Sequence, residues 1–198
     1  MDKIYSVNGP VVKVADTKSF AMQEMVYVGK KRLIGEVIRV QSDFTTIQVY
    51  EGTTGLMPDE PVTSTGAPMS ATLGPGIINN IFDGIERPLK KLEEVSGAFI
   101  ADGADVSSLD TEKKYPVTMT VKTGDKLSAG DIYCTCPETP LITHKCMLSP
   151  LSNGGEVIWT AENGDYTIND VVAKIKAPNG AVEELTLCQK WPIRTSRP

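Results

Sequence analysis

The sequence predicts a mainly β protein: a small N-terminal β-barrel, a second domain that is β-sandwich-like, and an ordered linker with one short helix between them. Short β-branched runs separated by turn residues fill both ends of the chain, and neither end shows a sustained helical period. The connecting stretch is rich in glycine and proline but too apolar for a flexible linker. Two β-rich modules and a packed connector follow from these observations.

Residues 3–65 predict the barrel. The turn Asn8-Gly9-Pro10 separates two valine-rich runs, and further runs at 33–40 and 45–50 are also bounded by turn residues. Several short strands in so few residues bury one face best by closing on themselves, which also removes exposed strand edges. An open meander of the same strands remains the alternative.

Residues 66–89 predict an ordered hinge, because a connector this apolar must pack against something. The helix follows, with apolar residues at helical spacing: Ile85, Leu89, Leu92 and Val95. Pro88 fits only near the start of this helix and Gly97 is a typical stop. The polar residues 102–114 predict a connecting loop.

Residues 115–188 predict the sandwich from a weak internal repeat. Gly124-Asp125 precedes Asp131, and about forty residues later Gly164-Asp165 precedes Asp170. Each half is expected to place a Gly-Asp turn before a strand, so that two similar halves pack face to face. Chance similarity of turn residues is the alternative. Residues 178–180, Pro-Asn-Gly, predict a hairpin between 171–175 and 182–187.

Composition excludes several classes of protein. The net charge of −5 argues against a nucleic-acid binder, which needs a basic face. No apolar run approaches the roughly 20 residues that cross a bilayer, so we expect no membrane insertion. The N-terminus lacks the pattern of a secretory signal, which predicts a cytoplasmic protein whose four cysteines are reduced thiols.

One cluster of residues has metal-like chemistry: Cys134, Cys136, His144 and Cys146. Thiolate and imidazole ligands suit zinc, but a Cys-x-Cys pair places both sulfurs on one face of a strand, where cysteine is commonly a buried hydrophobe. Lys145 raises a second possibility, because biotin or lipoate is attached to a lysine at a hairpin tip between the two halves of such a sandwich. The sequence around it only partly matches those carriers.

The chain contains no G-x-x-x-x-G-K-[ST] loop. The glycine-rich residues 73–77 make a poor phosphate site because Pro75 has no amide donor. The single histidine has no serine or acid placed by spacing to suggest a triad. The sequence therefore predicts no catalytic, cofactor-binding or metal-binding residue within residues 1–198.

Residues 66–89 closely resemble the catalytic A subunits of the V-type and archaeal-type rotary ATPases, called ATP synthase alpha chains in bacteria. The matching segments are Leu-Gly-Pro-Gly at 73–76 and Ile-Phe-Asp-Gly-Ile-Glu-Arg-Pro-Leu at 81–89. The resemblance extends to Trp-Pro-Ile-Arg at 191–194 and over essentially the whole chain. It implies a crown barrel at 1–66, a linker and short helix at 67–112, an inserted bulge domain at 113–188, and the start of a nucleotide-binding core at 189–198.

The resemblance implies a part of a protein that couples ATP hydrolysis or synthesis to proton or sodium transport. Its partners would be non-catalytic B subunits and other A subunits in a hexameric ring, and the peripheral stalk through the bulge domain, with the complex peripheral to the membrane. ATP and Mg would be used by the parent, whereas the chain itself would be an inactive N-terminal fragment without cofactors.

Removal of the nucleotide-binding core would leave residues 67–100 and 189–198 without their packing partner, and residues 189–198 have no obvious partner strand. The hinge should therefore be loosely ordered, or covered by the bulge domain or a neighbouring molecule. The alternative to the whole interpretation is a self-contained binding or carrier protein with a biotinyl- or lipoyl-like domain.

Overall fold

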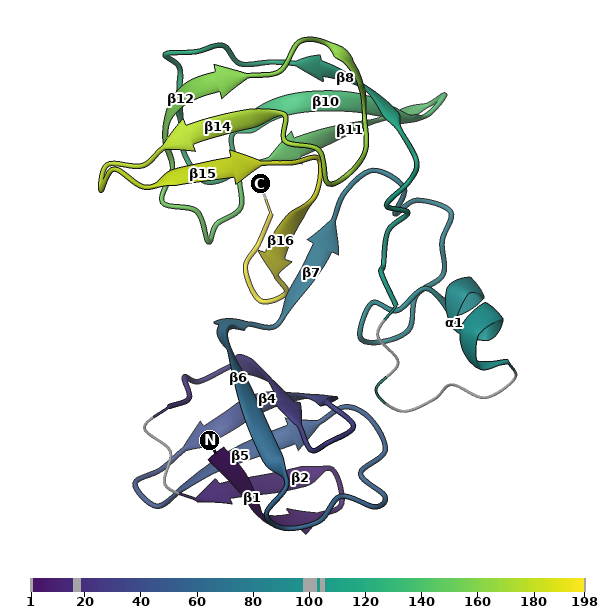
Figure 1. The fold of residues 1–198 in the computed structure, drawn as a ribbon, viewed down its shortest axis with the longest axis vertical. Coiled ribbons are helices and arrows are strands. Elements are labelled where there is room, and N and C mark those ends of the chain that lie inside the picture. Colours follow the sequence, from purple (N-terminus) through teal and green to yellow (C-terminus); the bar gives the residue numbers. More distant parts are fainter. Residues whose placement is uncertain (1, 16–18, 98–102, 104–105, 198) are drawn as a thin grey trace. The chain divides into compact units, whose positions relative to one another are not determined.

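The computed structural model describes residues 2–15, 19–97, 103 and 106–197 (Figure 1). The chain divides into two compact units. The barrel unit comprises Met1–Met69 and Lys91–Asp105, and the sandwich unit comprises Ser70–Lys90 and Val106–Pro198. These units cut the chain elsewhere than the four segments expected from the sequence, since the hinge and residues 189–198 both belong to the sandwich unit.

The barrel unit is a closed barrel of six antiparallel strands in the order β1-β2-β5-β4-β3-β6. Its strands are β1 (Asp2–Asn8), β2 (Val11–Ala15), β3 (Glu24–Val28), β4 (Leu33–Val40), β5 (Phe44–Val49) and β6 (Pro61–Pro68). Closure buries an aliphatic interior in which Val12, Val37 and Ile47 have no exposed surface. The predicted barrel is confirmed and the open meander is wrong.

The sixth strand, β6, was not expected from the sequence, because its glycine and two prolines are typical of a hinge. It closes the barrel by pairing with β1 on one side and β3 on the other. The prolines stand at its two ends, where a missing amide donor costs least. The side chain of Glu24 accepts hydrogen bonds from the amide of Gly66 and the hydroxyl of Ser64, which fixes the end of β6 to β3.

The helix α1 (Leu89–Ser96) directly follows Pro88, as predicted. Gly97 has a φ of 68°, and its amide donates to the carbonyl of Glu93 at 2.8 Å, which ends the helix in the left-handed conformation that glycine adopts easily. Ile85 lies outside the helix. Most of the predicted loop at 102–114 is described from residue 106 onward and contains no strand there; residues 102, 104 and 105 lie outside the described residues.

The sandwich unit contains two four-stranded sheets, in the orders β11-β10-β8-β13 and β15-β14-β12-β9 (Figure 1). The strands are β8 (Tyr115–Met119), β9 (Lys126–Leu127), β10 (Ile132–Thr139), β11 (Ile142–Met147), β12 (Gly155–Thr160), β13 (Gly164–Tyr166), β14 (Ala173–Lys176) and β15 (Val182–Leu185). Strands β8–β11 and β12–β15 occupy equivalent places, except that β9 and β13 each pair into the sheet of the other repeat. The internal repeat is therefore real.

The repeated acidic residues are only partly placed as predicted. Asp131 and Asp170 each accept a hydrogen bond at 2.7 Å from the amide three residues earlier, which makes two equivalent turns. Gly124 lies in a turn before β9, as expected. Gly164 and Asp165, however, lie within β13 instead of in a turn before it, because this segment pairs with β8. The expected hairpin at 178–180 joins β14 to β15.

The hinge and the end of the chain pair with each other. β7 (Ser70–Leu73) and β16 (Gln189–Pro192) form a two-stranded antiparallel sheet in which Trp191 lies opposite Ala71. Trp191 is 5% exposed and its indole N–H donates to the carbonyl of Thr195. The expectation that residues 189–198 lack a partner strand is wrong, and of the two outcomes expected for the hinge, covering by the sandwich is the one observed.

Candidate functional site

The loop after β7 carries Gly74 and Gly76 within the Leu-Gly-Pro-Gly motif, and both glycines are required sterically. A Cβ on Gly74 would lie 2.8 Å from Cδ1 of Leu109 and 3.0 Å from Cβ of Cys188. Gly76 has a φ of 99°, and a Cβ there would lie 2.5 Å from the hydroxyl of Tyr115. The motif therefore lets the backbone approach the sandwich more closely than any side chain permits.

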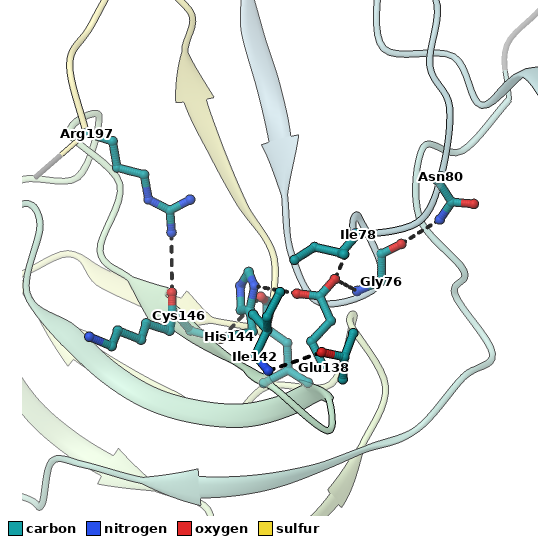
Figure 2. Close-up of polar contacts among 11 residues, drawn as sticks. Gly76, Ile78, Asn80, Glu138, Ile142, His144, Cys146 and Arg197 are labelled. Carbon is teal, nitrogen blue, oxygen red and sulfur yellow. Dashed lines mark hydrogen bonds and ion pairs between the residues drawn. The ribbon is translucent and has the colours of Figure 1, made fainter.

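Glu138, near the end of β10, binds this loop (Figure 2). Its Oε1 atom accepts hydrogen bonds from the amides of Gly76 at 2.8 Å and Ile78 at 2.9 Å. The carbonyl of Gly76 in turn accepts a bond from the side-chain amide of Asn80 at 2.6 Å. The side chain of Glu138 is only 3% exposed, so these amides solvate a carboxylate that water barely reaches. The loop's convergent amides are thus already bonded to an anion of the chain itself.

His144, on β11, lies beside Glu138. Its Nδ1 atom is 3.4 Å from Oε2 of Glu138, and its Nε2 atom is buried without a hydrogen-bond partner among the described residues. Burial lowers the pKa of His144, the charge of Arg197 lowers it further, and the charge of Glu138 only partly offsets these effects. An unpartnered Nε2 activates no nucleophile, so this pair is not part of a catalytic triad.

The cysteines form part of the sandwich core. Cys134 lies opposite Cys146 and Cys136 lies opposite His144 across β10 and β11, and all three cysteines are buried. A hydrogen bond to Cys146 and burial raise the pKa of Cys136, and a hydrogen bond to Cys134 together with burial raises the pKa of Cys146. Protonated thiols are poor zinc ligands. In the described part of the chain, no group of three or more His, Cys, Asp or Glu residues could hold a metal ion.

Lys145 does not lie where a carrier lysine would. It is in the middle of β11, opposite Thr135, whereas the tip of the β10–β11 hairpin is formed by Pro140 and Leu141. The expected position at a hairpin tip is wrong, because the two halves are joined by residues 148–154, after β11 ends. The carrier alternative loses its attachment site.

The second matching motif, residues 81–89, folds as a loop held by its own acidic residues. Asp83 accepts hydrogen bonds from the amides of Ile85 and Arg87 and forms a 2.7 Å ion pair with Nε of Arg87. Glu86 accepts from the amide of Thr72 on β7 at 2.7 Å, and burial raises the pKa of this carboxyl group. The charged residues of the motif are therefore used to fix the loop to β7.

A cleft of about 330 Å³ lies beside these contacts. It is lined by Leu73, Gly74, Ile77, Ile78, Glu138, Ile142, Thr143, His144, Lys145, Met147 and Arg197. The guanidinium group of Arg197 donates to the carbonyl of Lys145 at the rim of the cleft (Figure 2). The residues that the sequence singled out and the structure brings together are Cys134, Cys136, His144, Cys146 and the Leu-Gly-Pro-Gly loop.

Sequence reasoning missed Glu138, although a signal for it existed. In a strand, alternate side chains point to the same face, so Glu138 continues the inward row of Cys134 and Cys136. An acidic residue at the end of an inward row predicts a buried carboxylate that requires donors. In the part of the chain that the structure describes, no helix has the length and apolarity needed to cross a membrane.

Two family models match the chain. The model of the ATP synthase alpha/beta family β-barrel domain matches residues 4–66, and that of the ATP synthase alpha/beta subunit barrel-sandwich domain matches residues 106–194. They correspond to the closed barrel and to the two-sheet sandwich, and together they match well over half of the chain.

Curated relatives match the full length of the chain. It is 48% identical over 198 residues to the A subunit of the A-type ATP synthase of Desulfurococcus sp. (strain SY) and 48% identical over 201 residues to the V-type ATP synthase alpha chain of Halothermothrix orenii. In both cases all of this chain and 34% of the relative are covered. The V-type ATP synthase alpha chain 2 of Clostridium tetani is 49% identical, over 98% of this chain and 33% of that protein.

Among solved structures, the assembled ATPase EscN of the enteropathogenic E. coli type III secretion system is similar at a TM-score of 0.41 and 20% identity, covering 44% of this chain and 21% of that one. That likeness is too weak to carry an argument. The chain thus spans about a third of the length of the curated relatives it matches. On the two domain models and the identity across both units, the chain belongs to the ATP synthase alpha/beta family.

Proposed function

We propose that this chain is part of the catalytic A subunit of a V-type or A-type ATPase, which couples ATP hydrolysis or synthesis to the transport of protons or sodium ions. The observation that carries the proposal is 48% identity to catalytic-chain relatives over all 198 residues, through the barrel, both motifs and the sandwich. The carrier alternative has no comparable support, because its lysine lies within a strand.

The contribution of this chain is mechanical. A closed barrel has no free strand edges, so it joins neighbouring subunits through side chains on its surface. Tyr5, Met22 and Met57 are more than half exposed on the barrel unit and are suited to such contacts with A and B subunits in a hexameric ring. The sandwich would contact the peripheral stalk. The complex would be cytoplasmic and peripheral to the membrane, without a nucleic-acid partner.

Catalysis and its cofactors, ATP and Mg, are assigned to the remainder of the parent protein. None of the 198 residues forms a G-x-x-x-x-G-K-[ST] motif, and the glycine-rich loop uses its amides to bind Glu138. We therefore assign no catalytic, cofactor-binding or metal-binding residue to this chain and infer that it is inactive by itself.

Calorimetric titration of this chain with Mg-ATP should show no binding with a Kd below about 1 mM, which corresponds to less than about 4 kcal/mol of binding free energy. The physical reason is that the backbone donors best placed for a phosphate are bonded to a buried carboxylate. Titration of a Glu138→Ala variant serves as the control, since it frees those amides. Micromolar binding to the unmodified chain would show that it contains a nucleotide site.

A chimera tests the proposed function directly. The matching third of the Desulfurococcus protein is replaced by this chain, and the chimera is assembled with its partner subunits. We expect an assembled complex that hydrolyses Mg-ATP within about tenfold of the parent rate, or within about 1.4 kcal/mol of its activation free energy. Chimeras that exchange only residues 4–66 or only 106–194 separate the two domains. A folded full exchange that does not assemble would contradict the proposal.

A further inference from the structure

The contact between Glu138 and His144 is unusual in its burial. The side chains are 3% and 9% exposed, and the chain contains no other histidine. Glu138 joins the loop to the sandwich, because one of its oxygens receives both loop amides while the other faces the imidazole (Figure 2). The protonation state of a single ring therefore bears directly on the atoms that hold residues 74–78.

A neutral imidazole fits this site. With its proton on Nδ1 it points an N–H toward Oε2 of Glu138, and only a lone pair on Nε2 stays unpartnered. Protonation places a charged N–H at Nε2, where the described residues offer no acceptor. An unsatisfied charged donor costs more than an unsatisfied lone pair, so the protonated ring requires water at Nε2.

Residues 74–78 stand between Nε2 and that water. Gly74, Ile77 and Ile78 line the same cleft as His144, so detachment of this segment widens the way to the ring. We propose that the His144–Glu138 pair is a pH-sensitive latch, which holds residues 74–78 on the sandwich while the imidazole is neutral and releases them when it gains a proton.

The other charged and titratable groups around the ring support this direction. Arg197, from the segment after β16, opposes a positive charge on the ring, and Lys145, next to it on β11, adds another cation at the rim. Cys136, opposite on β10, is a protonated thiol, and Tyr115, from β8 beyond Glu138, has its pKa raised by burial and stays neutral. From the loop itself, Glu138 meets only backbone amides. Glu138 is the one nearby group that favours protonation of the ring.

The expected pH dependence follows from the lowered pKa of His144 in the closed state. The open state titrates near the ordinary value of about 6.5, so it binds more protons than the closed state below that pH. The stability of the latch is complete above pH 6.5 and falls as the pH drops toward the lower pKa of the closed state. A ring that stays neutral while closed gives about a tenfold rise in the open population between pH 7.5 and 5.5.

Amide hydrogen exchange measured by NMR on the whole chain tests the latch. Protection factors of Gly76 and Ile78 should fall about tenfold between pH 7.5 and 5.5, after correction for intrinsic exchange. The amide of Thr167, which is bonded to Asp170 in an unrelated turn, is the internal control and should not change. In His144→Asn, which keeps a donor near Nδ1 but cannot be protonated, Gly76 and Ile78 should show no pH response.

Equal pH responses in the two proteins, or none in the unmodified chain, would overturn the proposal. Should His144→Asn fail to fold, the ring resonances of the single histidine in the unmodified chain decide the matter. A titration midpoint below 6.5 supports the latch, and a midpoint at or above 6.5 refutes it. The inference concerns this chain's own loop and does not depend on the proposed function.

Discussion

Replacing Glu138 with alanine is expected to lower the free energy of unfolding of the sandwich unit by about 3–5 kcal/mol. The amides of Gly76 and Ile78 each lose a charge-assisted hydrogen bond of about 1.5–3 kcal/mol and remain largely buried. Urea unfolding followed by tryptophan fluorescence measures this unit alone, because both tryptophans of the chain, Trp159 and Trp191, lie in it.

Two variants separate the hydrogen bonds from unspecific effects of substitution. Glu138→Gln keeps an oxygen that can accept from both amides, so it should cost only about 1 kcal/mol. Glu156→Ala removes an exposed glutamate from β12 of the same unit and should change stability by no more than about 0.5 kcal/mol. A loss of less than about 1 kcal/mol in Glu138→Ala would mean that water replaces the carboxylate and that the loop is not held by it.

Substitution of Gly76 by alanine is the second large effect, expected at about 2–4 kcal/mol in the same assay. Two costs add: a φ of 99° that alanine rarely adopts, and a Cβ placed 2.5 Å from the hydroxyl of Tyr115. The ring of Tyr115 belongs to the sandwich core and is 2% exposed, so it cannot move aside without disturbing its neighbours.

Gly84→Ala is the matched control for this prediction. Gly84 lies in the same stretch of chain, has no positive φ and has nothing within 4 Å of the added Cβ, so its replacement should be nearly neutral. Adding Tyr115→Phe to Gly76→Ala should restore the part due to the clash and leave the part due to φ. The hydroxyl has no hydrogen-bond partner in the described structure, so its removal alone costs little. Equal stability of Gly76→Ala and Gly84→Ala would refute the steric argument.

The features predictable from sequence were those encoded by residues close together in the chain. Asn8, Gly9 and Gly97 mark turns and a helix end through their own backbone preferences, and alternating β-branched residues mark strands. The barrel, the short helix and the β14–β15 hairpin follow from these local signals. The internal repeat was visible for a similar reason, since Asp131 and Asp170 make equivalent local turns.

Features that depend on distant pairing were not predictable. β7 and β16 are separated by more than a hundred residues, and short strands with a Trp-Pro dipeptide carry no signal for their partner. The tip of the β10–β11 hairpin consists of Pro140 and Leu141, without the glycine or asparagine that marks most tight turns, so Lys145 was placed at the tip in error. The bond between Glu138 and residues 76–78 likewise joins segments whose proximity only the tertiary fold creates.

The exchange of β9 and β13 between the two sheets bears on how the chain is made. During synthesis, the first sheet stays incomplete after β11 has emerged, because its edge strand β13 ends only at Tyr166. The ribosome must therefore deliver most of the second repeat before the first can close, and neither repeat is a stable translation intermediate by itself. A gene that encoded only one repeat would yield a sheet with an open edge, so duplication of the repeat had to be accompanied by interlocking of its products.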